Sequence, residues 1–310
     1  MNVLVTGATG FIGRHLVREL LHHKKYDVFC FVRNPKKAKL LEGLGAQLIY
    51  GDITDKKSLA KLKGYKIDLA FHCAAYVENK NIKKLHQVNV QGTRNVCDIC
   101  LEHRVSRLVY LSSVAVISGN TELPLREDLP FAATNAYGES KIEAEKVALE
   151  FRNKGLAITI LRPPIVYGED EPHALKFLLK LLKARLLPLI NQGENILHLA
   201  YVENVVSAML FCLESDEFLK GSFFVADKEA LRVKDIFKAL AKGIGAKPPG
   251  RLFKLTELLL LNLPGIGKKI SFFLKDRIYS LKRIESLGFK PHFEAKKSLI
   301  ISAEKLYYGK

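Results

Sequence analysis

The chain has 310 residues, of which 48% are hydrophobic, and this length and composition are typical of a globular protein with a large buried core. It contains neither a repeat nor a low-complexity stretch. The net charge of +17 would attract anionic cofactors, lipids or nucleic acid. Since the lysines are spread along the chain and no nucleic-acid-binding motif accompanies them, we expect a solvated basic surface and no nucleic-acid partner.

The first segment with a clear pattern is a short apolar strand followed by a glycine-rich loop. Residues 2–5 are the strand, residues 6–13 read Thr-Gly-Ala-Thr-Gly-Phe-Ile-Gly, and apolar residues then recur at helical spacing. Gly7 permits a tight turn, Gly10 lets the backbone approach a phosphate, and Gly13 lets the helix pack on the strand. A glycine triplet alone could be only a turn, but the strand before it and the helix after it favour a dinucleotide-binding loop.

The second strand, residues 27–32, leads into a basic turn. An acid at this point would accept hydrogen bonds from the ribose of NAD, whereas a cation favours the 2′-phosphate of NADP. Arg33 offers a planar guanidinium that suits phosphate, and Lys36, Lys37 and Arg14 are further candidate cations. The alternative is a solvated basic turn. We predict NADP as the coenzyme, with NAD as the alternative.

Two further strands, residues 46–50 and 67–72, each end in residues that suit a coenzyme site. Asp52 follows the first, at the edge of a parallel sheet where ligands bind. Small residues, Cys73-Ala74-Ala75, follow the second and would allow close approach of a coenzyme, although burial alone would also explain them.

A tyrosine and a lysine lie four residues apart in the strong helical pattern of residues 136–153. Tyr137 and Lys141 therefore share one helix face, and Ser113 follows the strand of residues 107–111. A phenol has a pKa of about 10, so we expect the Lys141 ammonium, with an oxidised nicotinamide, to lower it. Tyr137 would then donate or accept a proton as hydride moves, while Ser113 orients the substrate oxygen.

These segments together resemble the extended short-chain dehydrogenase/reductase family, which includes the NAD-dependent epimerases and dehydratases. The resemblance covers nearly the whole chain and rests on residues 6–13, Gly51-Asp52, 72–75, 89–93, Ser112-Ser113, 137–141 and 162–168. It implies an α/β fold with a doubly wound parallel Rossmann sheet and a small, mostly helical C-terminal lobe. It also implies catalytic roles for Ser113, Tyr137 and Lys141, adenine contacts from Asp52 and Ile53, nicotinamide contacts from Pro163 to Val166, and a structural or relay role for Asn89.

Departures from the family's motifs help to choose among its chemistries. Val114-Ala115 replaces the acidic pair that follows the catalytic hydroxyl of the dehydratases, and Leu197-His198-Leu199 lacks the arginine with which epimerases grip a diphosphate. The chain is more similar to the dihydroflavonol-reductase-like and 3β-hydroxysteroid-dehydrogenase-like branches. We therefore predict an oxidoreductase that interconverts a secondary alcohol and a ketone on a largely apolar or ring-bearing small molecule. The alternatives are a sugar-nucleotide epimerase and a non-catalytic nucleotide-binding assembly or sensor protein.

The predicted domains are a coenzyme-binding domain of residues 1–168, to which 192–228 return, and a substrate lobe of 169–191 and 229–310. In the lobe, the apolar run with basic flanks at 251–277 is core or a lid over the pocket, or else a peripheral membrane contact. Helices 79–103 and 136–154 would serve a homodimer of the family's usual kind.

The five cysteines are an odd number and no secretory leader precedes the first strand, so we expect a cytoplasmic protein with reduced thiols. Cys97 and Cys100 read as ordinary helix cysteines, and no metal site is predicted. The predicted coenzyme-binding residues are Gly7, Thr9, Gly10, Phe11, Ile12, Gly13, Arg33, Asp52, Ile53, Cys73, Ala74, Ala75, Tyr137, Lys141, Pro163, Ile165 and Val166.

Overall fold

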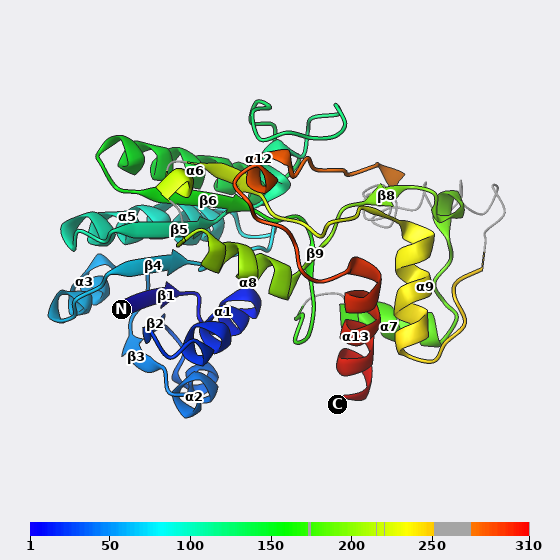
Figure 1. Ribbon diagram of the computed structural model, residues 1–310, viewed down its shortest axis with the longest axis horizontal. Coiled ribbons are helices and arrows are strands. Elements are labelled where there is room, and N and C mark those ends of the chain that lie inside the picture. The colour runs from blue at the N-terminus through cyan, green and yellow to red at the C-terminus, as the bar shows by residue number, and fades with distance from the viewer. Residues whose placement is uncertain (173–174, 215, 220, 251–273, 310) are drawn as a thin grey trace.

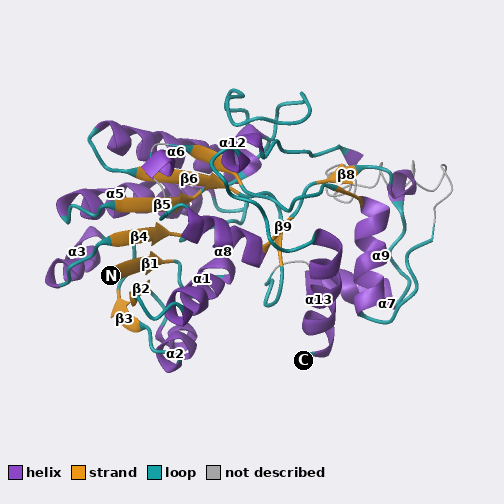
Figure 2. Ribbon diagram, in the orientation of Figure 1, coloured by secondary structure: helices purple, strands orange, loops and turns teal. Residues whose placement is uncertain are grey.

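The computed structural model describes residues 1–172, 175–214, 216–219, 221–250 and 274–309. Its centre is a seven-stranded parallel sheet in the order β10-β6-β5-β4-β1-β2-β3 (Figures 1 and 2). The strands are β1 (Asn2–Thr6), β2 (Asp27–Val32), β3 (Gln47–Tyr50), β4 (Leu69–His72), β5 (Arg107–Leu111), β6 (Ile158–Arg162) and β10 (Ser222–Phe224). The predicted parallel α/β sheet is confirmed.

Helices cover both faces of this sheet because each strand carries apolar side chains on both sides. One face packs against α1 (Phe11–His22), α2 (Pro35–Gly43) and α8 (Val202–Phe211). The other packs against α3 (Lys56–Leu59), α5 (Gly92–Glu102) and α6 (Ala136–Asn153). The strand order reverses between β1 and β4, and in a doubly wound sheet a ligand binds at that point, beyond the carboxyl ends of the strands.

The C-terminal lobe has an apolar core of its own, formed chiefly by three helices that stand beside the sheet in Figure 1. They are α7 (Leu175–Lys183), α9 (Val233–Gly243) and α13 (Ala295–Tyr308). Two small ladders, β8 (Ile196–Leu197) with β11 (Leu231–Arg232) and β7 (Val166–Tyr167) with β9 (Ala200–Tyr201), complete it.

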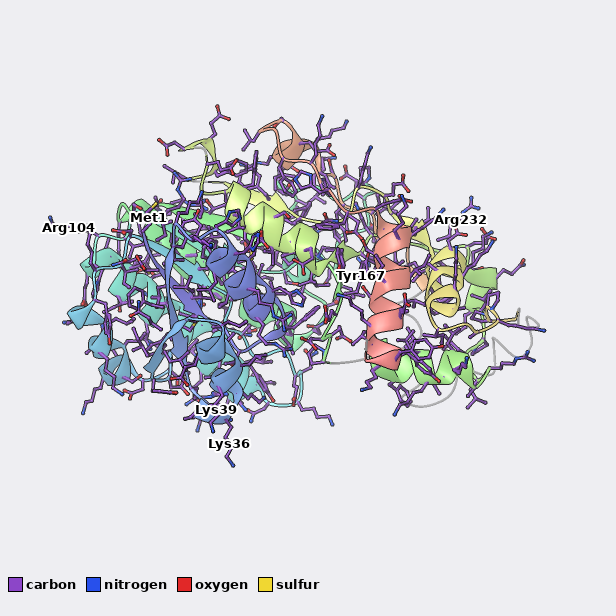
Figure 3. The ribbon with its side chains drawn as sticks, turned by 60° about the horizontal axis from the view of Figure 1, so that its bottom comes forward. Met1, Lys36, Lys39, Arg104, Tyr167 and Arg232 are labelled. Atoms are coloured by element: carbon purple, nitrogen blue, oxygen red, sulfur yellow. The ribbon has the colours of Figure 1, made fainter. Side chains whose placement is uncertain are left out.

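A buried hydrogen bond joins the sheet and the lobe, in addition to the chain segments that cross between them. Tyr167 lies between them (Figure 3), and its hydroxyl donates to Asp227 Oδ2 at 2.8 Å. The chain passes between the sheet and the lobe more than once: β8 pairs with β11 in the lobe, β10 lies in the main sheet, and α12 (Lys282–Glu285) packs against β10.

The long helix expected over residues 79–103 is divided in the structure. It consists of α4 (Ile82–Leu85), a π-helical turn (His86–Gln91) and α5. The Asn81 side chain accepts a hydrogen bond from Lys84 N and so caps the start of α4. Hydrophobic spacing does not distinguish the π turn from a regular helix, because the turn inserts a single residue into an otherwise helical pattern.

Residues 251–273, most of the segment considered for membrane contact, lie outside the described residues. In the described part of the chain, no helix combines the length and apolarity needed to span a membrane.

Candidate active site

The glycine loop forms a cradle at the carboxyl end of β1. Gly7 has a φ of +72°, and a Cβ added there would lie 2.5 Å from Ala74 N. A Cβ on Gly13 would lie 2.2 Å from Gly7 O, so α1 packs directly on the loop. Gly10 precedes α1 without a side-chain cap, and the first turn of α1 carries no acid. The free amide groups of this helix start therefore face a site that suits the pyrophosphate of a dinucleotide.

A groove runs from this cradle in both directions along the sheet edge. We define it by two adjoining hollows that share Gly7, Thr9, Gly10, Lys37, Cys73 and Ala75. One hollow extends to Arg33, Asp52, Ile53 and Ala74, and the other, with a volume of about 760 Å³, to Phe11, Ile12, Gly13, Tyr137, Lys141, Pro163 and Val166. The groove thus brings together the predicted coenzyme-binding residues except Ile165, which lines a separate pocket beyond it.

Arg33, the predicted 2′-phosphate ligand, lies at the end of the groove opposite Tyr137. Its side chain is 65% exposed, and its guanidinium forms an ion pair of 3.3 Å with Asp52. Burial acts to raise the pKa of Asp52, but hydrogen bonds from Thr54 and the charge of Arg33 hold it below its usual value. Lys37 lines the groove, whereas Lys36 projects from α2 into solvent (Figure 3).

The remaining candidate cation, Arg14, lines the hollow that contains Tyr137 and not the hollow that contains Arg33. The structure therefore places it away from the position predicted for the 2′-phosphate. Its Nε is buried without a hydrogen-bond partner.

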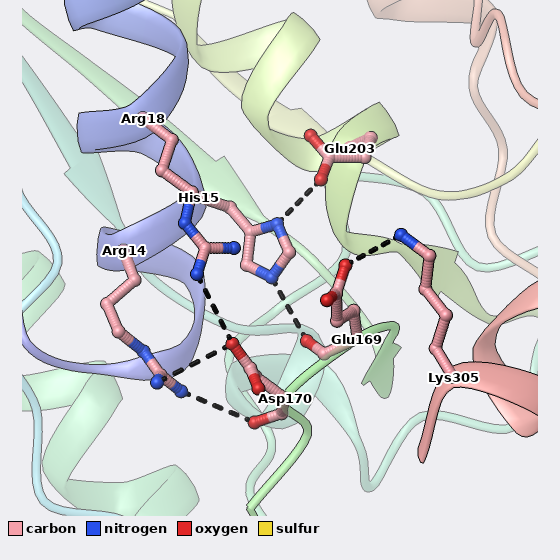
Figure 4. A network of polar contacts seen from close by, with 7 residues as sticks. All are labelled: Arg14, His15, Arg18, Glu169, Asp170, Glu203 and Lys305. Carbon is pink, nitrogen blue, oxygen red and sulfur yellow. Dashed lines mark hydrogen bonds and ion pairs between the residues drawn. The ribbon is translucent and has the colours of Figure 1, made fainter. Parts of the chain in front are cut away.

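The wall of the groove near Arg14 is fastened by polar contacts between segments far apart in sequence (Figure 4). Arg14 and Arg18 of α1 both lie 3.6 Å from Asp170 Oδ2, in the turn after β7. His15 contacts Glu203 Oε1 at 2.6 Å and the carbonyl oxygen of Glu169 at 3.0 Å. The turn that carries Glu171 and Pro172 into the groove is therefore attached to the helix of the glycine loop.

Ser113 and Tyr137 lie where the groove meets a second pocket, since both side chains line the two cavities. Ser113 is delivered by the end of β5 and Tyr137 by the first turn of α6. Asn135 caps α6 by accepting a hydrogen bond from Gly138 N, and Asn79 accepts one from Tyr137 N at 2.8 Å. The main chain of Tyr137 is thus fixed from two sides.

Lys141 lies one turn further along α6 and is almost fully buried, with 1% of its surface exposed. Its Nζ donates to the carbonyl oxygen of Leu111 at 2.9 Å and stands 4.4 Å above the ring of Tyr110. Burial lowers the pKa of Lys141 to about 7, against the opposing effects of Glu145 and Cys73. At neutral pH, the ammonium and the neutral amine are therefore both populated.

The expected lowering of the Tyr137 pKa by Lys141 is not seen. Burial raises the pKa of the Tyr137 phenol, and only a hydrogen bond with Ser113 acts in the opposite direction. The Lys141 ammonium is directed at the Leu111 carbonyl oxygen instead. Tyr137 therefore holds its proton at neutral pH, which is the state required of a proton donor.

A buried ion pair that the sequence analysis did not identify supports this arrangement. Arg162, at the end of β6, donates to both carboxylate oxygens of Glu145, with Nη2 to Oε2 at 2.6 Å and Nε to Oε1 at 2.9 Å. Ser112 Oγ donates to the same Oε1 at 2.5 Å. The sequence did contain a signal for this ion pair. Glu145 follows Lys141 by four residues and therefore lies on the same helix face, and Arg162 begins the Arg-Pro-Pro segment at the end of the next strand.

Asn89, for which the family resemblance implied a structural or relay role, joins three segments by hydrogen bonds. Its side chain accepts from Tyr76 N at 2.8 Å and donates to Ser140 Oγ at 2.8 Å. Its carbonyl oxygen accepts from Thr93, whose hydroxyl also contacts His72 Nε2 at 3.0 Å. Burial lowers the pKa of His72 to about 3, so this ring is neutral and serves as a hydrogen-bonding bridge.

The second pocket, with a volume of about 360 Å³, is mostly apolar. It is lined by Val77, Ser113, Val114, Ala115, Ser118, Thr134, Asn135, Tyr137, Pro164, Ile165, Leu197, His198, Leu199, Arg277 and Tyr279. His198 Nδ1 accepts from Tyr279 N, and burial lowers the pKa of the ring, so it is no fixed cation. Arg277, eighty residues after Leu197, supplies the cation that residues 197–199 lack.

The glycine cradle lies where the strand order of the sheet reverses, and the groove joins it to Tyr137, Lys141 and a substrate-sized pocket. Together these features define a dinucleotide-binding enzyme of the extended short-chain type. The model of the NAD dependent epimerase/dehydratase family matches residues 3–226, and the chain belongs to that family.

Two relatives and one solved structure show the range of chemistry among similar proteins. The chain is 28% identical over 261 residues to the decarboxylating sterol-4-alpha-carboxylate 3-dehydrogenase of Mus musculus, covering 79% of this chain and 69% of that protein. It is 29% identical over 263 residues to the 2-alkyl-3-oxoalkanoate reductase of Stenotrophomonas maltophilia, covering 79% and 76%. The UDP-glucuronic acid 4-epimerase of Bacillus cereus, solved with NAD, superposes with a TM-score of 0.80 at 22% identity, covering 99% and 98%. At that identity the likeness shows the fold alone.

Proposed function

We propose that the protein is an NADP-preferring oxidoreductase that interconverts a secondary alcohol and a ketone on a largely apolar substrate. The observation that carries this proposal is the position of Ser113 and Tyr137 at the junction of the groove and the second pocket. A substrate in the pocket and a coenzyme in the groove would meet at these two hydroxyl groups. The names of both relatives describe oxidation or reduction of this kind, and both also describe a substrate that carries a carboxylate.

When bound, the nicotinamide coenzyme supplies or accepts the hydride. The chain's own residues then handle the proton and the position of the substrate. Ser113 Oγ holds the substrate oxygen, and Tyr137 gives its proton to that oxygen during ketone reduction or takes one during alcohol oxidation. Lys141, whose Nζ is held by the Leu111 carbonyl oxygen, would place its ammonium beneath the groove and would hydrogen-bond the ribose of a bound coenzyme. The apolar pocket wall excludes water from the reacting carbon.

The preference for NADP rests on Arg33 and Lys37, which line the adenosine end of the groove. In this proposal the Arg33 guanidinium leaves Asp52 and forms charge-assisted hydrogen bonds with the 2′-phosphate, helped by Lys37. Asp52 remains hydrogen-bonded to Thr54. The competing interaction is the 3.3 Å ion pair itself, because an Arg33 that stays on Asp52 cannot bind a 2′-phosphate.

The test measures NADPH and NADH binding by fluorescence and then turnover on a panel of secondary alcohols and ketones. The proposal expects tighter binding of NADPH and turnover on apolar members of the panel. Equal or tighter binding of NADH would refute the coenzyme preference, and absence of turnover with bound NADPH would refute the reaction.

A sugar-nucleotide epimerase is the second candidate function, and Arg277 favours it, because a cation in the pocket can grip a diphosphate. An epimerase returns the hydride to its substrate and consumes no coenzyme. Copurification of tightly bound NAD and competition by UDP would support this candidate over the first.

A further inference from the structure

Arg277 enters the second pocket through main-chain pairing with β8. Its N donates to Ile196 O at 2.8 Å, and its carbonyl oxygen accepts from His198 N at 2.8 Å. This pairing sets Arg277 opposite Leu197, at the wall of the pocket. The position of the residue is therefore fixed by backbone hydrogen bonds, which leaves its side chain available for a ligand.

The guanidinium of Arg277 has spare donors. Nη1 donates to the carbonyl oxygen of Ser118 at 2.8 Å, which orients the group, and Nε is buried without a hydrogen-bond partner. An arginine has five N–H donors, and leaving a buried donor unpaired costs free energy. Within the described residues Arg277 has no carboxylate partner, in contrast to Arg162, which is paired with Glu145.

The surroundings of Arg277 do not neutralise its charge from within the pocket. The pocket lining includes no aspartate or glutamate, and Arg277 is its one lysine or arginine among the described residues. His198 is neutral because burial lowers its pKa. A single positive group among mostly apolar side chains attracts an anion, since the pocket lining supplies no counter-charge of its own.

We infer that Arg277 binds a carboxylate of the substrate, so that the substrate class is a hydroxy or oxo carboxylic acid with an apolar body. This inference rests on the proposed function for the identity of the reacting group. A carboxylate presents two oxygens and one charge, which one planar guanidinium satisfies. A diphosphate carries at least two charges, and one of them would stay unpaired in this lining.

The test compares 3-hydroxydecanoate with its methyl ester, two ligands that differ only in the charged group. Binding of each to the full chain loaded with NADPH is measured by calorimetry, so that the result does not depend on turnover. We expect the wild-type protein to bind the acid about 10- to 100-fold more tightly, the range of a charge-assisted hydrogen bond.

Arg277→Gln should remove this preference while leaving the affinity for the ester unchanged, and Arg277→Lys should retain part of it. The matched control is Arg232→Gln, an exposed arginine at the edge of the same lobe (Figure 3), which should keep the full preference. If the glutamine variant is unstable, the lysine variant still tests the inference. It retains the charge but lacks the planar guanidinium, so its preference for the acid should be smaller than that of the wild type.

Equal binding of acid and ester by the wild type, no binding of the acid, or a preference that survives Arg277→Gln would each overturn the inference. Tight binding of UDP that depends on Arg277 would also overturn it and would assign the cation to a diphosphate. If the acid binds through Arg277 but is never oxidised with NADP, the proposed function fails while the assignment of Arg277 stands.

Discussion

Replacement of Glu145 by glutamine tests how the buried ion pair supports Lys141. The carboxylate is fully buried and accepts hydrogen bonds from Ser112 and from two nitrogens of Arg162. Glu145→Gln keeps the shape of the side chain but leaves the Arg162 charge without a counter-ion. Breaking a buried pair in this way costs about 3–5 kcal/mol, and we expect the lower end because an amide oxygen can still accept one bond.

The same substitution acts on Lys141, whose pKa Glu145 raises. Without that charge the pKa of Lys141 falls further below about 7, so less ammonium is present at neutral pH. Coenzyme affinity should therefore decline at pH 7 and recover as the pH is lowered, while the wild type keeps its affinity to higher pH. Urea denaturation and the pH dependence of NADPH binding measure the two effects separately.

Glu143→Gln is the matched control, because Glu143 lies on the same helix with 54% of its side chain exposed. It should change neither quantity. The double variant Glu145→Leu with Arg162→Met should regain most of the lost stability, since both charges leave together. Removal of one partner of a buried pair is expected to cost several times more than about 1 kcal/mol. A smaller loss of unfolding free energy than this in Glu145→Gln would refute the role given to the ion pair. So would an unchanged pH profile.

Three further substitutions test other parts of the site. Gly13→Ala places a Cβ 2.2 Å from Gly7 O, so we expect a loss of about 1–3 kcal/mol from overpacking and weaker NADPH binding; unchanged calorimetric affinity would show that the loop is not the cradle. Arg33→Ala should weaken NADPH binding about 10-fold and leave NADH binding unchanged, as judged by fluorescence titration; a parallel loss for NADH would count against a 2′-phosphate contact. Thr93→Val removes the hydroxyl between His72 and Asn89 and should cost about 1–3 kcal/mol in urea denaturation; full stability in this variant would contradict the bridging role.

The sheet and the groove follow from short-range patterns that the sequence displays directly. The strand, glycine loop and helix of residues 2–22 occupy the predicted positions, and the predicted α6 agrees with the structure at both ends, because capping and periodicity are local properties. The π turn at His86–Gln91 was missed, because hydrophobic spacing does not show it; within the turn, Asn89 accepts from Tyr76 N and donates to Ser140 Oγ, which are contacts to residues distant in sequence.

Long-range contacts account for the parts of the site that sequence reasoning could not reach. The position of Arg277 beside Leu197 depends on a parallel bridge between segments eighty residues apart. Lys141 was expected to act on Tyr137, but the Leu111 carbonyl oxygen, thirty residues before it, determines where its ammonium points. Ile165 shares a segment with Pro163 and Val166, yet it lines the pocket instead of the groove.

The most direct measurement is the rate of a single turnover by Tyr137→Phe, at saturating NADPH, on a ketone that the wild type reduces. If Tyr137 is the proton donor, the rate falls by about 10²- to 10⁴-fold while the dissociation constant of NADPH stays within a factor of about two, because the hydroxyl supplies the proton and not the coenzyme site. Reduction by this variant at a rate near that of the wild type would contradict the central claim that the phenol between groove and pocket performs the proton transfer.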